Sequence, residues 1–131
     1  MFGNGMRAVD TNVLVRLVTR DDVKQAGRAD DFVATGAWVS HLVLVETTWV
    51  LSAVYELKAD AIATALDMLL NHEALSIAEP DVVRAALDHF RKTPTLGFSN
   101  CLILEVARAA GHLPIGTFDR ALGKLAGAQR L

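Results

Sequence analysis

The segment that most constrains the fold is residues 7–9, a short and largely apolar stretch that ends at an acidic residue, Asp10. From Thr11 to about Arg20, apolar side chains recur with the spacing of one helix face. A strand followed at once by a helix is typical of parallel sheets in α/β folds, in which functional side chains lie at the carboxyl ends of the strands. The segment therefore predicts a parallel strand that carries the Asp10 carboxylate to the functional edge of a sheet.

The same alternation of short strands and helices continues along the whole chain. Three further strands are predicted, at residues 37–40, 75–78 and 113–117. Further helices are predicted between Asp22 and Gly36, at residues 41–55, 59–70, 81–91 and 99–110, and from Asp119 onward. Because strands and helices alternate, we expect right-handed crossovers and a largely parallel sheet. The 131 residues thus predict one α/β domain over residues 1–131, with a short, mostly parallel sheet flanked by about seven helices.

Composition narrows the class of protein. Hydrophobic residues make up 52% of the chain and charged residues 21%, which is typical of a compact globular protein. The net charge of −2 argues against a broad basic surface for nucleic acid, although a local one stays open. Cys101 is the single cysteine, and its apolar neighbours predict a buried, unreactive thiol. No apolar stretch reaches the length of a membrane span, and residues 1–5 are predicted to be a frayed end without a signal peptide, so we expect a cytoplasmic protein.

Three later places repeat the arrangement seen at Asp10. They are Glu46 in the third predicted helix, the Ser99-Asn100 pair at the start of the sixth, and Asp119 just after the last predicted strand. The helix around Glu46 is apolar on every side, so we predict that it is central and buried. A buried, ionised carboxylate is costly unless it is protonated, paired or bound to a metal ion, and no Lys or Arg lies within four residues of Glu46.

Each of these residues also has a purely structural interpretation. Asp10, Asn100 and Asp119 are all suitable N-caps for the helices that follow them, and Thr117 competes with Asp119 for that role. The two roles are compatible, because a capping carboxylate keeps lone pairs free for a cation. The four histidines lack the paired spacing of a metal site and are predicted to be surface or helix-end residues. Several basic residues are predicted to be solvated helix ends, some of which could contact phosphates: Arg16, Arg20, Arg91, Lys92, Arg120 and Lys124.

Carboxylates that converge from separate segments favour hydrolysis of phosphate esters. Mg²⁺ and Mn²⁺ prefer oxygen ligands, and a cluster of three carboxylates is unstable at neutral pH without a compensating cation or proton. A bound ion lowers the pKa of a water molecule, orients the phosphate and stabilises charge on the leaving oxygen.

The four segments resemble a PIN domain, and in particular a VapC-type toxin of a bacterial toxin–antitoxin pair, over nearly the whole chain. The resemblance rests on residues 10–14, 44–51, 97–103 with 107–111, and 117–122. It implies that Asp10, Glu46, Asn100 and Asp119 occupy the four catalytic and metal-binding positions. The implied supporting residues are Thr11, Asn12, Ser99 and Thr117.

The resemblance also implies an activity and partners. It implies a Mg²⁺- or Mn²⁺-dependent endoribonuclease that forms homodimers and cuts tRNA, rRNA or other structured RNA. In that family a small antitoxin, here a VapB-like protein, inserts a C-terminal segment into a groove at the active site and blocks it.

Asn100 departs from the family pattern, which has Asp at this position. The amide removes one negative charge and replaces an acceptor oxygen by an NH₂ donor, so we expect weaker metal binding and a weakened or inactive enzyme. We hypothesise that Asn100 is a substitution introduced to tame a toxic nuclease; a natural, attenuated homologue is the alternative. An Asn codon in the chromosomal copy would exclude the first explanation.

Two other functions stay open from the sequence. Asn100 favours a catalytically silent PIN module that binds an antitoxin-like partner or RNA. A phosphatase of the haloacid dehalogenase type, with Asp10 as nucleophile, requires a second acid two residues later, and Asn12 does not supply it.

Overall fold

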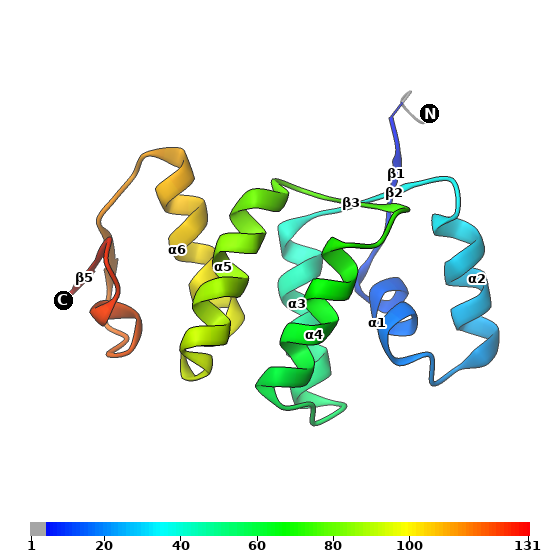
Figure 1. Cartoon of the computed structure of the whole chain (residues 1–131), viewed down its shortest axis with the longest axis horizontal. Helices are drawn as coiled ribbons and strands as arrows, with labels where there is room; N and C mark the ends of the chain where they lie inside the picture. Colours follow the sequence, from blue (N-terminus) through cyan, green and yellow to red (C-terminus); the bar gives the residue numbers. More distant parts are fainter. Residues whose placement is uncertain (1–4) are drawn as a thin grey trace. The chain divides into compact units, whose positions relative to one another are not determined.

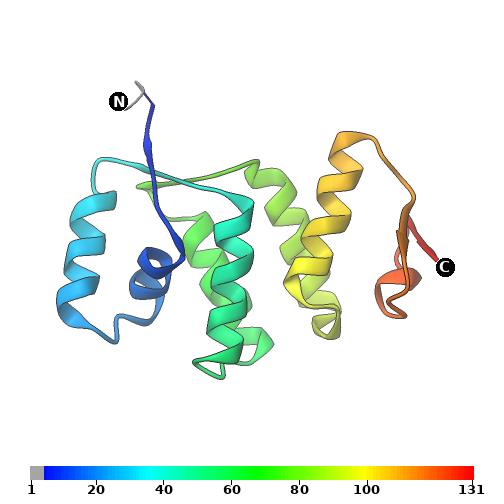
Figure 2. The ribbon, with the colours of Figure 1, turned by 180° about the vertical axis from the view of Figure 1, so that it is seen from behind.

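The structure is a computed structural model that describes residues 5–131, and its internal contacts divide it into two compact units, Met1–Ala78 and Glu79–Leu131 (Figures 1 and 2). Over these residues the chain has the α/β architecture with short parallel strands that the sequence predicts, and it has six α-helices where about seven helices were predicted. The predicted frayed end lies outside the described residues except for Gly5, and the single domain over residues 1–131 stays a prediction. No helix within residues 5–131 is both long and apolar enough to cross a membrane.

The first unit is built on a three-stranded parallel sheet. Its strands β1 (Arg7–Ala8), β2 (Ala37–Val39) and β3 (Leu75–Ile77) lie in that order, which confirms the first three predicted strands. Two helices connect each pair of neighbouring strands: α1 (Thr11–Thr19) and α2 (Val23–Val33) follow β1, and α3 (His41–Ala53) and α4 (Ala59–Leu70) follow β2. Along β2 and β3 buried and exposed residues alternate, so one face of the sheet packs into the core and the other carries the half-exposed Trp38.

Helix α3 is not buried on every side, so that prediction was wrong. Its buried residues follow one helical stripe: Leu44, Thr47, Thr48 and Leu51. On the opposite stripe Leu42 is 83% exposed and Trp49 66% exposed, and Glu46 lies between them, also exposed. Periodicity cannot separate an apolar face that packs inside the unit from one that stays in solvent, because both carry the same residue types.

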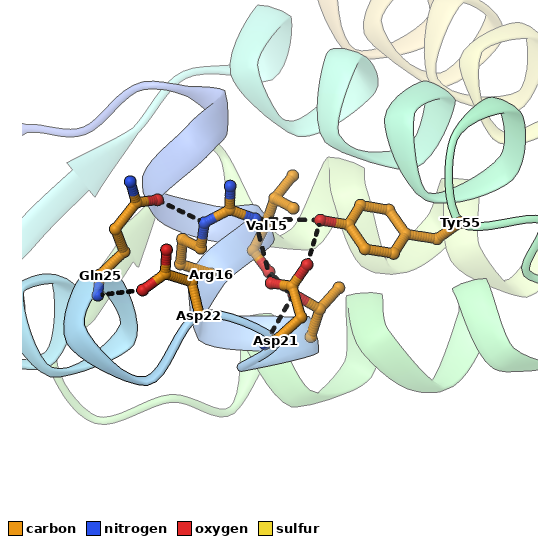
Figure 3. Close-up of polar contacts among 7 residues, drawn as sticks. Val15, Arg16, Asp21, Asp22, Gln25 and Tyr55 are labelled. Atoms are coloured by element: carbon orange, nitrogen blue, oxygen red, sulfur yellow. Dashed lines mark hydrogen bonds and ion pairs between the residues drawn. The ribbon is translucent and has the colours of Figure 1, made fainter.

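A polar network anchors the carboxyl end of α1, as Figure 3 shows. The guanidinium of Arg16 donates to Gln25 Oε1 at 2.6 Å, to Asp21 Oδ1 at 3.0 Å and to the hydroxyl oxygen of Tyr55 at 3.0 Å. The Tyr55 hydroxyl in turn donates to Asp21 Oδ2 at 2.8 Å. Arg16 is therefore not the solvated helix end that the sequence predicted. The network joins α2 and the end of α3 to α1, at the opposite end of α1 from Asp10.

The second unit consists of two packed helices and a small C-terminal sheet. Its elements are α5 (Pro80–Lys92), η1 (Pro94–Leu96), α6 (Phe98–Ala110), β4 (Ile115–Thr117), η2 (Leu122–Lys124) and β5 (Ala128–Arg130). Phe90 of α5 meets Phe98 of α6 edge to face, with ring centroids 6.2 Å apart. Helix α6 ends at Gly111, whose φ of +83° is the left-handed conformation that glycine adopts without strain.

The predicted helix from Asp119 onward was wrong. The chain forms one short 3₁₀ turn, η2, and then β5, which pairs in parallel with β4 as a separate two-stranded sheet. Two glycines explain the difference. A Cβ atom on Gly123 would lie 2.8 Å from Cβ of Arg130, so the turn and β5 approach closely only with glycine here. Gly127 has φ +91° and directs the chain into β5.

A buried carboxylate connects α6 to both of its neighbours. Glu105 is only 7% exposed, and its Oε2 lies 3.2 Å from His89 Nε2 of α5 and 3.2 Å from Arg108 Nε. Arg108 also donates to the carbonyl oxygen of Ala126 at 2.9 Å, just before β5. His89 is thus part of an internal cluster and not simply a surface residue. Sequence reasoning missed this cluster because His89 and Glu105 are 16 positions apart.

Candidate functional site

Asp10 caps helix α1 and keeps one carboxylate oxygen available. It follows β1 with an extended backbone, and its Oδ1 accepts a hydrogen bond from Val13 N at 3.3 Å. The side chain is exposed, and no donor among residues 5–131 contacts its Oδ2. The predicted cap is confirmed, and Oδ2 is free to face a cation. Of the two supporting residues beside it, Thr11 is buried and Asn12 is exposed.

Glu46 lies on the exposed stripe of α3. It lines a shallow depression with four apolar neighbours from the same helix: Leu42, Val45, Trp49 and Val50. Within the part of the chain that the structure describes, no hydrogen bond or ion pair engages its carboxylate. Because Glu46 is exposed, the argument that a buried carboxylate needs a metal ion does not apply to it. What favours a functional role is position, because Asp10 and Glu46 follow the carboxyl ends of neighbouring parallel strands, β1 and β2.

Asn100 is the third residue of α6 and does not cap it. The residue before the helix is Gly97, with φ +77°, and no side chain caps this end. The buried ring of Phe98 anchors the first turn, so the helix begins earlier than the sequence predicted. Asn100 is half-buried, and its Nδ2 donates to the carbonyl oxygen of Leu96 at 3.0 Å. The amide nitrogen is thus held by the backbone, whereas the neighbouring Ser99 is exposed.

Asp119 lies in the exposed turn after β4. Its backbone N–H donates to Thr117 Oγ1 at 3.0 Å, and its Oδ1 accepts from Leu122 N at 2.8 Å. The carboxylate thus stabilises the 3₁₀ turn in the place where a helix was predicted. Helix α6 and strand β4 run in opposite directions in both views, so the first turn of α6 and the end of β4 lie at the same end of the second unit (Figures 1 and 2).

The donor types fit a hard divalent cation. Asp10 and Glu46 belong to the first unit, and Asn100 and Asp119 to the second. Three carboxylates and one amide oxygen are the ligands that Mg²⁺ and Mn²⁺ prefer, and the three carboxylates are exposed. Among residues 5–131, no group of three or more His, Cys, Asp or Glu side chains is gathered closely enough to hold a metal ion.

Cys101, next to Asn100, does not supply a nucleophile. Its side chain is fully buried, and burial raises the pKa of the thiol to about 11. A thiol with that pKa is almost entirely protonated at neutral pH, and only the thiolate is reactive. The prediction of a buried cysteine is confirmed, and the raised pKa favours an unreactive thiol.

Comparison with known proteins identifies the family. A family model described as the PIN domain matches residues 7–128, a range that includes all four candidate positions. Neither the curated proteins nor the solved structures compared with the chain gave a match. PIN domains are typically nucleases that use divalent metal ions. Since the family model covers nearly the whole sequence, the chain belongs to the PIN domain family.

Proposed function

We propose that this protein is a VapC-type endoribonuclease toxin that uses Mg²⁺ or Mn²⁺ to hydrolyse RNA. One observation supports the proposal most. The three acids within the PIN match, Asp10, Glu46 and Asp119, are all exposed, and they lie at ends of strands or in the helices after them. Asp10 and Asp119 each use one carboxylate oxygen to accept a backbone hydrogen bond and keep the other. Such a carboxylate is fixed in direction by the protein and still able to bind a cation.

The chain's own residues would orient the ligands. The N-cap bond to Val13 and the bond to Leu122 fix the carboxylates of Asp10 and Asp119, and Thr117 holds the backbone of Asp119. The Leu96 bond turns the NH₂ group of Asn100 toward the backbone, which leaves Oδ1 as its ligand atom. A bound metal ion supplies an activated water and stabilises the charge that develops on the phosphate.

The test compares this protein with its Asn100→Asp variant on total RNA, with Mg²⁺, Mn²⁺ or EDTA. We expect the variant to cut RNA with either ion, EDTA to abolish cleavage, and the protein with Asn100 to be much slower. Asn71→Asp is a matched control, because Asn71 Nδ2 also donates to a backbone carbonyl four residues earlier, that of Asp67, at 3.0 Å. Cleavage that rises equally in both variants, or silence in every metal, would refute the proposal.

A second candidate is a catalytically silent PIN module that binds an antitoxin-like partner or RNA. Asn100 favours it, because a neutral oxygen binds a divalent cation less strongly than a carboxylate does. Silence of the Asn100→Asp variant together with tight RNA binding would support this alternative.

We further propose two protein partners, a second copy of the chain and a VapB-like antitoxin. The toxin would act on RNA in the cytoplasm. The exposed stripe of α3 supports association, since Leu42 and Trp49 are large apolar residues left in solvent. Sedimentation of the purified chain should give a dimer, and Trp49→Glu should shift it toward the 14.1 kDa monomer. Growth arrest by the Asn100→Asp variant, relieved by co-expression of its antitoxin, would test the toxin role.

A further inference from the structure

Phe118 is an aromatic residue in an unusual place. It lies between Thr117 and Asp119 and is 80% exposed, more than either tryptophan of the chain. A single exposed apolar residue needs no explanation. Phe118, however, lies directly beside a proposed catalytic carboxylate and is followed along the chain by cationic side chains. Surfaces that bind nucleic acids combine aromatic rings with cations in this way.

The chain around Phe118 is basic. After Asp119, the remaining residues 120–131 contain three basic side chains, Arg120, Lys124 and Arg130, and no acidic one. All three are exposed, and no acidic side chain among residues 5–131 forms an ion pair with any of them. The second unit as a whole has seven Lys and Arg against five Asp and Glu, whereas the first has six against ten. Although the whole chain has a net charge of −2, the second unit is net positive, and its basic C-terminal segment begins directly after Asp119.

The C-terminal turn brings these side chains onto one element. Arg130 of β5 is the register partner of Thr117 at the end of β4. Its side chain also packs over Gly123, since a Cβ atom there would lie 2.8 Å from Arg130 Cβ. Lys124 follows Gly123 in η2, and Arg120 follows Asp119. The element β4–η2–β5 thus carries one ring and three cations around the turn that holds Asp119.

We propose that this element, the C-terminal platform of Phe118, Arg120, Lys124 and Arg130, binds a single-stranded stretch of RNA. Phe118 stacks on an unpaired base, and the three cations contact the phosphates on either side of it. Duplex RNA fits the platform poorly, because its bases are stacked on each other and offer no free face to a ring. The inference rests on the proposed function for RNA as the substrate, and it adds the binding surface and the preference for unpaired nucleotides.

The platform is tested by binding and not by cleavage. Fluorescence anisotropy in EDTA measures the affinity of the full chain for an unstructured 12-nucleotide RNA and for the same RNA annealed to its complement, over a series of salt concentrations. The charge variant is Arg120→Gln/Lys124→Gln/Arg130→Gln. Its matched control, Arg28→Gln/Arg84→Gln/Lys92→Gln, removes two arginines and one lysine that are also exposed.

The two parts of the platform should have different effects. The charge variant should flatten the slope of log K against log salt by about 2, since each phosphate contact with a single strand contributes about 0.7, and its control should not. Phe118→Ala should weaken single-strand binding by about five- to 150-fold with the slope unchanged, and Phe118→Tyr should restore it. Thermal unfolding of each variant separates a lost contact from a lost fold, because Phe118→Ala should melt as the parent does.

Three results would overturn the platform. The first is equal RNA binding by the charge variant and its control. The second is equal affinity of the chain for single-stranded and duplex RNA. The third is that binding of an acidic peptide such as oligo-glutamate requires the platform residues whereas binding of RNA does not. The proposed function fails separately. If Asn100→Asp cuts RNA but the platform variants bind normally, only the platform is refuted. If no variant cuts RNA but platform variants lose RNA binding, the enzyme is refuted and the platform stands.

Discussion

The side-chain amide of Asn100 donates its Nδ2 hydrogen to the carbonyl oxygen of Leu96 across 3.0 Å. The sequence predicted weaker metal binding partly because the amide introduces an NH₂ donor, and in the structure that donor is bound to the backbone. The opposite orientation of the amide would place two oxygens in contact, which is unfavourable, so Oδ1 is the atom turned outward. Position 100 therefore keeps a neutral oxygen that does not face the Leu96 carbonyl, and it lacks the charge of the family's acid.

The hydrogen bond to Leu96 predicts that Asn100→Asp makes the metal-free protein less stable. A carboxylate cannot donate to the carbonyl, so the variant should lose about 1 kcal/mol of unfolding free energy in EDTA. Mn²⁺ at about 100 times its dissociation constant should then add about 2.7 kcal/mol to the variant. Thermal melts with and without the ion measure both effects. A variant that is as stable as its parent in EDTA would show that the Leu96 bond contributes nothing.

Asp10 has a structural and a proposed catalytic role, and two substitutions separate them. Asn is as good an N-cap as Asp, so Asp10→Asn should keep the stability of the protein and remove a ligand charge. Asp10→Ala should also lose the bond to Val13 and about 1 kcal/mol of stability. In the Asn100→Asp background both should abolish metal-dependent cleavage, whereas their melting temperatures should differ. If Asp10→Asn cuts RNA normally, Asp10 is a cap and nothing more.

Glu46 should be dispensable for folding. Because its carboxylate is exposed and has no partner among the described residues, Glu46→Gln should change the unfolding free energy by no more than about 0.5 kcal/mol. The same substitution should remove Mn²⁺-dependent cleavage in the Asn100→Asp background. Chemical denaturation and the RNA assay are the two measurements. A large loss of stability would restore the idea that Glu46 is buried.

The Arg16 network predicts that acid destabilises the first unit. The hydroxyl of Thr19, that of Tyr55 and the charge of Arg16 lower the pKa of Asp21. A carboxylate with a lowered folded-state pKa contributes stability above the ordinary Asp pKa, about 3.9, and that contribution disappears as the pH falls through the lowered value. Melts between pH 6 and pH 2 should show the loss, and Tyr55→Phe should reduce it. Asp31→Asn is the control, because it removes an exposed carboxylate of the same unit that lies outside the Arg16 network.

Cys101 should be inaccessible to thiol reagents in the folded protein. Because the thiol is buried and its pKa is raised to about 11, a disulfide reagent at pH 8 should modify less than about 1% as fast as it modifies the unfolded chain. The fully reactive thiol in denaturant is the internal control. Rapid modification under native conditions would mean that the first turns of α6 open readily.

Much of the architecture follows from local patterns in the sequence. Short apolar stretches between helical patterns predicted β1, β2 and β3, and the end of α6 followed from Gly111, because strand and helix periodicity and left-handed glycines are properties of neighbouring residues. The four candidate positions could also be identified from the sequence, because an acid or amide just after a strand or in the next helix is a local signal.

Long-range packing decided the rest. The sequence could not show that α3 buries one stripe and exposes the one with Glu46, nor that Glu105 and His89 meet across 16 positions. It also predicted a helix after Asp119, where the close approach of Gly123 to Arg130 gives a turn and a strand. The orientation of the Asn100 amide is local, but it too required the backbone conformation that brings the Leu96 carbonyl oxygen to 3.0 Å from Nδ2. The sequence alone therefore determined which residues could bind a metal ion, whereas the tertiary structure decided which of their atoms are free to do so, because hydrogen bonds and burial are set by neighbours in space.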